Sequence, residues 1–213
     1  MGGMSSTGGQ GRQLYVNNTS GLVYQLQTKG VSGETTHSWS YPAFLNYSGS
    51  WVHITLTQNN TAITENAVKM YVNGEEVTPS YIAGESGATC IESNAELFFF
   101  GAPNSGSKSW KGRFDEIVLQ TGSAWTAASV RGIYNGGYAW NLNETSVATA
   151  WWTCGDDRLP GSENYPYILR DRFNGYNLTQ SNASMINSHV YINGIPQLPT
   201  ASFLVHATEE GEQ

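Results

Sequence analysis

Hydrophobic and polar residues alternate with a period of two through much of the first half of the chain. In the segment 51–57, Val52, Ile54 and Leu56 share one parity, and polar residues lie between them. Successive side chains of a strand point to opposite faces, so this alternation predicts a strand buried on one face. The segment 13–29 alternates on both sides of the turn-forming residues 17–21, which predicts a hairpin.

A second hairpin is predicted at 68–77, because Val68, Met70 and Val72 alternate before Asn73-Gly74. This dipeptide suits a two-residue turn that needs positive φ at both positions. An unbroken apolar run at 97–100 predicts a central strand covered on both faces. Two further strands are predicted at 114–119 and 147–152. The residues 30–50 show no clear period and predict a loop with a short strand, and 78–95 predict a long loop.

Only one segment has helix signals. Thr126 can serve as an N-cap, residues 127–134 give barely two turns, and Gly136 lies where a left-handed C-cap belongs. A helix this short is not stable alone, so it must pack against the strands.

Composition supports one β-rich domain. The chain has 213 residues, 24 glycines and only 13% charged residues, a profile typical of many short strands joined by tight turns. We expect residues 1–12 to form a flexible leader without the apolar centre of a secretory signal. Residues 13–205 are expected to form a single domain, and 206–213 an acidic tail.

Charge and hydropathy argue against two classes of partner. The net charge is −7 and the ten Lys and Arg residues are scattered, which does not favour nucleic-acid binding. No apolar run approaches the roughly 20 residues of a membrane-spanning helix. The sequence therefore predicts neither a nucleic-acid partner nor a membrane partner.

Four motifs in the order 51–55, 70–74, 114–117 and 134–137 resemble the laminin-G-like, concanavalin A-like jelly roll. The resemblance covers roughly residues 13–137 and implies an all-β, two-sheet antiparallel sandwich with one short helix. The family usually has further strands before the hairpin at 13–29, and this sequence lacks them. Either residues 147–205 complete the sandwich or a neighbouring subunit does. One of the two is needed, because open strand edges favour association.

The second half shows a narrower resemblance. The segments 150–156, 168–171 and 174–179 resemble a stretch that follows such jelly rolls in structural proteins of marine tailed bacteriophages, although Asn174-Gly175 is shorter than their loop. This implies a virion structural protein, in a capsid decoration, fibre or tail, assembled in the host cytoplasm. Other virion proteins and further copies of the chain are the partners it implies.

Catalytic motifs are missing from the sequence. Glucanases of this fold carry Glu-x-Asp-x-x-Glu, which does not occur here. The nearest acidic pair is Asp115-Glu116, and adjacent strand residues point to opposite faces, so the two cannot flank one bond. The four histidines are isolated, and His53 is expected to face solvent or a sheet neighbour. We therefore predict no enzymatic activity, with a glycoside hydrolase as the least favoured class.

Two kinds of binding site are conceivable. Relatives on this fold often bind calcium through Asp and Asn oxygens, and the candidates here, which are also good turn formers, are Asp156, Asp157, Asp171 and Asn174. Aromatic rings in loops could stack on glycans of a host surface, although Trp and Tyr more often pack in cores. These aromatic candidates are Trp39, Tyr41, Trp110, Tyr138 and Trp140.

Two alternatives stay open at this stage. A lectin-like module that binds carbohydrate outside any virion is the second function that the sequence allows. Cys90 and Cys154 could form one disulfide if the fold places them side by side, and otherwise they are free thiols.

Overall fold

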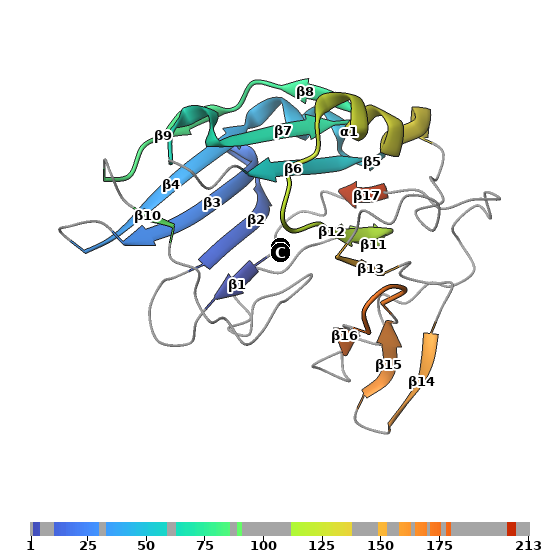
Figure 1. Cartoon of the computed structure of the whole chain (residues 1–213). Coiled ribbons are helices and arrows are strands. Elements are labelled where there is room, and N and C mark those ends of the chain that lie inside the picture. Colours follow the sequence, from blue (N-terminus) through green and yellow to red (C-terminus); the bar gives the residue numbers. More distant parts are fainter. Residues whose placement is uncertain are drawn as a thin grey trace.

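The computed structural model of the chain describes residues 2–4, 11–29, 33–58, 63–85, 89–90, 112–137, 149–152, 158–162, 165–169, 171–175, 178–179 and 204–207 (Figure 1). The predicted strand at 97–100 and Cys154 lie outside these residues.

The first layer is a six-stranded antiparallel sheet. Its strands run in the order β1 (Gly2–Met4), β2 (Gly11–Asn17), β3 (Gly21–Lys29), β4 (Glu34–Tyr41) and β9 (Ser80–Ile82), and β10 (Thr89–Cys90) also pairs with β3. The β2–β3 hairpin confirms the prediction at 13–29. In its turn the side-chain Oδ1 of Asn17 accepts hydrogen bonds from the amides of Thr19 and Ser20.

Two expectations about this sheet were wrong. The strand β1 lies inside the segment expected to be a leader, where it pairs with the start of β2. The strand β4 is eight residues long, whereas the sequence suggested a loop with a short strand. Both strands are held by their neighbours in the sheet, which local periodicity does not report.

The second layer contains β6 (Ile54–Gln58), β7 (Val68–Val72) and β8 (Glu75–Val77), again antiparallel. Asn73 has a φ of 50° and Gly74 a φ of 80°, which confirms the tight turn between β7 and β8. Asn73 also fixes the start of β6, since its side-chain Oδ1 accepts from the His53 amide at 3.0 Å and its own amide donates to the His53 carbonyl at 2.9 Å.

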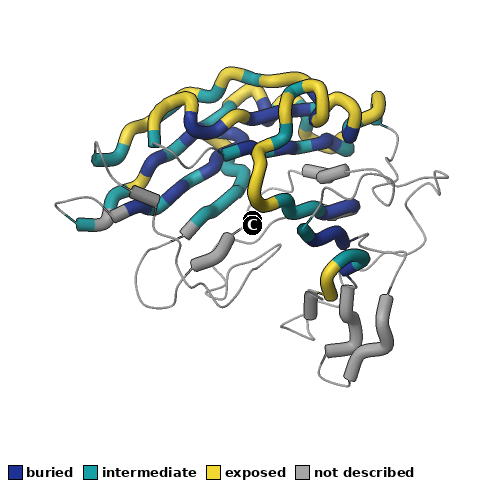
Figure 2. Tube along the Cα trace, in the orientation of Figure 1, coloured by how far each residue is buried: buried dark blue, intermediate teal, exposed yellow. Residues whose placement is uncertain are grey.

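The hydrophobic core lies between the two layers (Figure 2). The first sheet contributes inward side chains of β3 and β4, and Phe44 comes from the 3₁₀ helix η1 (Pro42–Tyr47) that follows. A second 3₁₀ helix, η2 (Glu65–Ala67), leads into β7. The buried core residues are Leu22, Tyr24, Leu26, Trp39, Phe44, Val52, Ala67, Val68, Met70 and Val72.

The helix α1 (Ala127–Tyr134) contacts β8 of the second sheet and lies beside the right-hand ends of β7 and β8 in Figure 1. It begins as predicted, with Thr126 Oγ1 accepting from the Ser129 amide at 3.2 Å. The left-handed turn starts one residue earlier than expected, at Asn135 with a φ of 46°, and continues through Gly136 in η3 (Asn135–Gly137). Asn tolerates this conformation because its short side chain bonds locally.

The second sheet is more buried than the alternation suggested. Tyr71 and His53 are each only 1% exposed, although both lie on the face away from the core. Of the two outcomes expected for His53, exposure to solvent is excluded, and contact with a sheet neighbour is confirmed, since its Nε2 lies 3.4 Å from Thr55 Oγ1.

Residues after 112 add short strands at one end of the sandwich. The strand β17 (Leu204–Ala207) lies between β11 (Gly112–Asp115) and β5 (Trp51–Val52), and β12 (Ile117–Leu119) pairs with β13 (Ala150–Trp152). The remaining strands β14 (Arg158–Ser162), β15 (Tyr165–Leu169) and β16 (Leu178–Thr179) form a small sheet of their own. The strand β17 extends past residue 205 into the segment expected to be a tail.

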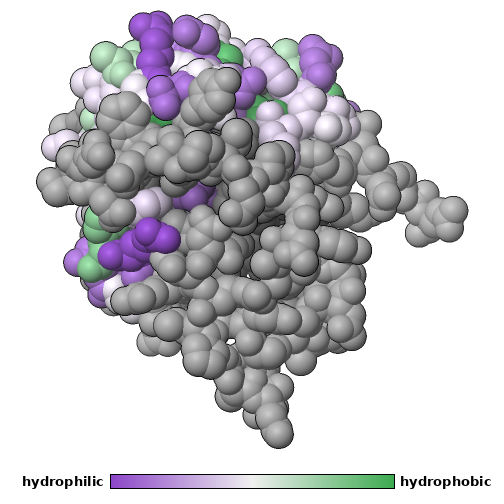
Figure 3. Space-filling model, turned by 90° about the vertical axis from the view of Figure 1, so that its right-hand side faces the viewer, coloured by the Kyte–Doolittle hydropathy of each residue, from purple (hydrophilic) through white to green (hydrophobic). Residues whose placement is uncertain are grey.

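Together these elements confirm the predicted fold class, an antiparallel β-sandwich with one short helix. None of the described helices has the length and hydropathy needed to cross a membrane. Figure 3 shows mainly hydrophilic residues over the described part at the top of the face that it presents.

Candidate functional site

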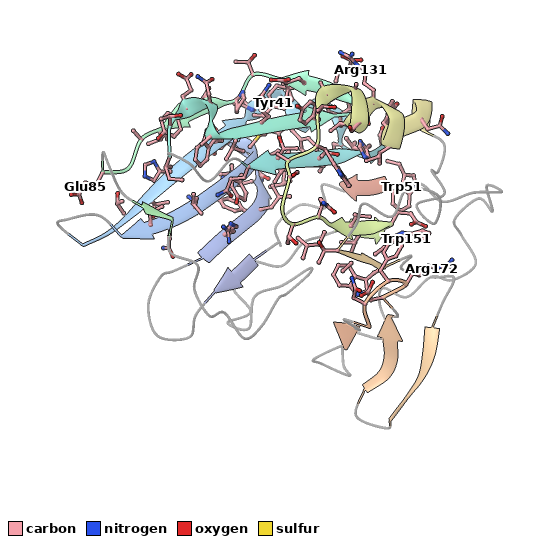
Figure 4. All side chains as sticks on the ribbon, viewed as in Figure 1. Tyr41, Trp51, Glu85, Arg131, Trp151 and Arg172 are labelled. Carbon is pink, nitrogen blue, oxygen red and sulfur yellow. The ribbon has the colours of Figure 1, made fainter. Side chains whose placement is uncertain are left out.

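Two buried carboxylates flank one tryptophan beside β12 and β13. Glu116 is 3% exposed, Asp171 is 4% exposed, and Trp151 between them is 2% exposed. Figure 4 shows Trp151 close to Arg172, on the opposite side of the molecule from Glu85. This cluster joins the first half of the chain to the segment 149–175, and we call it the Trp151 junction.

Glu116 interrupts the strand that the sequence predicted at 114–119. Its φ of 49° falls in the left-handed region, and it separates β11 from β12. Its carboxylate accepts a hydrogen bond from the indole N–H of Trp151. The argument that residues 115 and 116 alternate between faces of one regular strand was therefore wrong. The side chain is directed inward, because the backbone turns at this residue.

Asp171 holds the same tryptophan from its backbone side. Its Oδ1 accepts from the Trp151 amide at 2.8 Å and from the Phe173 amide at 3.1 Å, and its Oδ2 accepts from the Asn174 amide at 3.0 Å. The Arg172 amide donates in return to the Trp151 carbonyl at 2.9 Å. A carboxylate that accepts several amides is the usual device for fixing a tight turn.

The face of the indole is covered as well. The guanidinium carbon of Arg172 lies 5.0 Å from the ring centroid of Trp151, which is a cation–π distance. The ring of Phe173 lies 5.7 Å away on a tilted plane. The residues after Asp171 thus close over Trp151.

This geometry suits a structural joint rather than an acid pair for bond cleavage. General acid and nucleophile must both reach the substrate, whereas Glu116 and Asp171 are enclosed and bonded to protein donors. A buried carboxylate that keeps its hydrogen bonds instead specifies one arrangement of the groups around it.

The calcium candidates are placed only in part. Asp171 accepts three backbone amides and acts as a turn former, whereas the side-chain Nδ2 of Asn174 donates to the distant Thr149 carbonyl at 2.6 Å. Asp156 and Asp157 lie outside the described residues. In the part of the chain that the structure describes, no group of three or more His, Cys, Asp or Glu could hold a metal ion. Calcium binding stays a prediction.

The first glycan candidate was wrong. Trp39 is 0% exposed in the core and its indole N–H donates to the Glu65 carbonyl at 2.8 Å, so it cannot stack on a sugar. Tyr41 is half-buried and packs against the same core. Trp110, Tyr138 and Trp140 lie outside the described residues, and their proposed role stays a prediction.

Sequence reasoning missed the two buried histidines. Burial lowers the pKa of His53 to about 4 and also lowers the pKa of His37 below its ordinary value. His37 shares the parity of Trp39 and Tyr41 along β4. That alternation was the available signal that its ring points inward.

Comparison with known families agrees with this architecture. A laminin-G model of the concanavalin A-like lectin/glucanases superfamily matches residues 2–131, more than half of the chain. The chain belongs to this superfamily. The match includes β1 and ends within α1, so Trp151 and Asp171 lie beyond it.

The searches of curated proteins and of solved structures returned no match.

Proposed function

We propose that this chain is a non-enzymatic structural protein of a tailed-phage virion, in a capsid decoration, a fibre or a tail. The observation that carries the proposal is the Trp151 junction. It fixes to the jelly roll the described residues 150–152 and 171–175, which belong to the stretch whose sequence resembles the segment found in phage structural proteins. A particle subunit needs such a segment held in one orientation.

The burial of the junction supports a structural role. Hydrogen bonds from Trp151 to both carboxylates connect β12, β13 and the turn at 171–175. Buried charged groups are costly unless they are bonded, so this joint is stable only when its parts are together. The described residues 150–152 and 171–175 are therefore held to the sandwich as one unit.

The partners in this proposal are other virion proteins and further copies of the chain. The strand β9 ends the order of the first sheet, and on it Ile82 is 64% exposed. A sheet edge with an exposed apolar side chain favours pairing with another polypeptide. Assembly would take place in the host cytoplasm.

Quantitative mass spectrometry of purified particles tests the proposal. We expect this chain in a fixed copy number per particle, and light scattering of the isolated protein should show a homo-oligomer. A chain that is absent from particles and monomeric in solution would contradict the proposal.

Glycan binding is the second candidate, and membership in a superfamily of lectins and glucanases favours it. A glycan array probed with the isolated protein, with calcium and after chelation, separates the two functions. If the isolated chain binds glycans as a monomer and is absent from phage particles, the lectin-like alternative is favoured. Binding by particles would add host recognition to the structural role.

The absence of catalysis is part of the proposal and has its own test. We expect no release of reducing sugar from polysaccharides by the wild type or by Glu116→Gln, which keeps an acceptor for the Trp151 indole. Sugar release that this substitution abolishes would contradict the proposal.

A further inference from the structure

Gly84 and Glu85, which follow β9, are held to β4 by hydrogen bonds to its side chains rather than by strand pairing. Strand pairing between β9 and β4 ends at Ile82, opposite Ser38. Beyond it the Gly84 amide donates to His37 Nδ1 at 3.2 Å, and the Glu85 amide donates to Thr35 Oγ1 at 2.8 Å. Figure 4 shows Glu85 at the end of the molecule away from the Trp151 junction. We call residues 80–85 the β9 segment.

The bond from Gly84 defines the protonation state of His37. An amide can only donate, so Nδ1 must offer its lone pair, and the neutral ring carries its proton on Nε2. The Tyr81 hydroxyl lies 2.8 Å from the same Nδ1, and in this tautomer it shares the single lone pair of that nitrogen with the Gly84 amide. On a protonated ring this hydroxyl can accept from Nδ1–H instead, so only the Gly84 bond requires the neutral ring.

The imidazole is closely covered. His37 is 2% exposed, and its ring stacks on Tyr81 at 6.1 Å between centroids. Its Nε2 is buried with no hydrogen-bond partner among the residues that the structure describes, and a Cβ placed on Gly84 would approach this atom to 2.9 Å. A positive charge on the ring would be enclosed under the β9 segment.

Protonation changes what Nδ1 can do. The imidazolium carries hydrogen on both nitrogens, so Nδ1 can no longer accept from Gly84, and two donors then face each other. The burial that opposes this charge lowers the pKa of His37. Loss of the Gly84 bond is therefore the expected result of protonation.

The groups around the ring do not offset the charge in the bonded arrangement. On β9, burial and the charge of Glu65 raise the pKa of Tyr81, so its hydroxyl stays neutral. The strand β3 places the uncharged Leu26 opposite His37. The acidic groups on neighbouring described elements are Glu65 on η2 and Glu85 in the β9 segment itself.

We propose that His37 is an acid-sensitive latch, which holds Gly84 on β4 while the ring is neutral and releases it when Nδ1 takes a proton. The pairing of Ser80–Ile82 with Ser38–Ser40 does not involve the ring and stays in place. The latch therefore makes the attachment of the chain just after β9 depend on pH.

Amide hydrogen exchange followed by NMR tests the latch. Between about pH 7.5 and about pH 5, we expect the protection of the Gly84 amide to fall at least about tenfold, after correction for intrinsic exchange. The Ser20 amide, which donates to Asn17 Oδ1 in the turn between β2 and β3, is the internal control for local opening and should keep its protection over this range.

The matched variant is His37→Asn. An asparagine Oδ1 occupies about the place of Nδ1 and accepts from Gly84 without titrating. We expect its Gly84 protection to stay constant over the same range. Constant protection in the wild type, or an equal loss in His37→Asn, would overturn the proposal.

Nitrogen NMR of the wild type tests the proposal even if this variant does not fold. The ring nitrogen shifts of wild-type His37 at neutral pH should report hydrogen on Nε2. Hydrogen on Nδ1 of the neutral ring would overturn the proposal, because that nitrogen could not accept from Gly84.

Discussion

His53 is enclosed between the sheet that carries it and the helix packed on that sheet. Its ring lies 5.5 Å from the ring of Tyr134, and its Nε2 lies 3.4 Å from Thr55 Oγ1. Burial lowers its pKa from 6.5 to about 4. A group of this kind makes stability depend on pH.

The direction of this pH dependence follows from the protonation of His53 in the unfolded and in the folded chain. The unfolded chain takes up a proton on His53 near pH 6.5, whereas the folded chain resists it until about pH 4. The stabilising effect of the neutral ring is therefore complete above about pH 6.5 and is lost as the pH falls toward 4, by about 3 kcal/mol in total.

We expect His53→Gln to lose less free energy of unfolding in acid than the wild type does. Part of the loss should remain, because the pKa of His37 is lowered in the same direction. Urea unfolding at a series of pH values measures it. An equal acid loss in variant and wild type would show that His53 does not titrate in this way.

Gly74 is required by two constraints at once. Its φ is 80°, and an added Cβ would lie 2.6 Å from the ring of Tyr134. We expect Gly74→Ala to lower the free energy of unfolding by about 2 kcal/mol or more, from backbone strain and displacement of the helix.

The matched control is Gly49→Ala. Gly49 has a φ of 75° with nothing within 4 Å, so this variant has strain without the clash. Denaturant unfolding compares the two. If Gly49→Ala were as destabilising as Gly74→Ala, contact with Tyr134 would not be the cause.

At the scale of elements, the pairing of β12 with β13 depends on side chains as well as on backbone bonds. Val118 is opposite Trp151 in the register, and the Trp151 indole donates to Glu116 just before β12. Such a bond between distant segments fixes the relative position of two short strands.

We expect Trp151→Phe to lower the free energy of unfolding by about 2 kcal/mol, because a donor to a buried carboxylate is lost together with apolar contact. Glu116→Gln keeps an acceptor and should cost less than about 1 kcal/mol. The double variant should lose less than the sum, as expected for partners in one contact. Exact additivity in denaturant unfolding would contradict the pairing.

At the scale of the whole molecule, strands inside the matched superfamily region pair with strands that follow it in the sequence. The family match ends at residue 131, yet β5 and β11 are joined through β17, and β12 pairs with β13. Without the later residues, these short strands would expose their edges and part of the core.

We therefore expect a protein truncated after Gly137 to aggregate or to unfold without a cooperative transition. Removal of 208–213 alone, which leaves β17 intact, is the control and should have little effect. Size-exclusion chromatography and thermal melting followed by circular dichroism decide this. A monodisperse, cooperatively melting fragment 1–137 would show that the later strands are dispensable.

Local sequence patterns were sufficient to predict the elements that depend on neighbouring residues. The hairpin at 13–29, the Asn73-Gly74 turn and the helix at 127–134 were all predicted, because alternation, turn residues and caps act over a few neighbours. The strands β1 and β4 were missed or underestimated. The pairing of β1 with β2 does not appear as a period in its own residues, and in β4 only His37, Trp39 and Tyr41 alternate.

The candidate sites were harder to predict. Trp39 was a plausible ring for sugar stacking, and the structure places it fully inside the core. Glu116 was placed in a regular strand, whereas its left-handed φ turns it toward Trp151. Exposure and side-chain direction depend on what packs from other parts of the chain, which one segment cannot report.

The sequence by itself determined the class of fold and the position of several strands and turns, because these depend on periodicity and on the backbone preferences of Gly, Asn and Thr. The tertiary structure alone decided which polar groups are enclosed. The helix covers His53, the turn at 171–175 closes over Trp151, and Gly84 covers His37. Each of these groups is buried by a segment at least 20 residues away along the chain, and burial is a property of contacts rather than of order in the sequence.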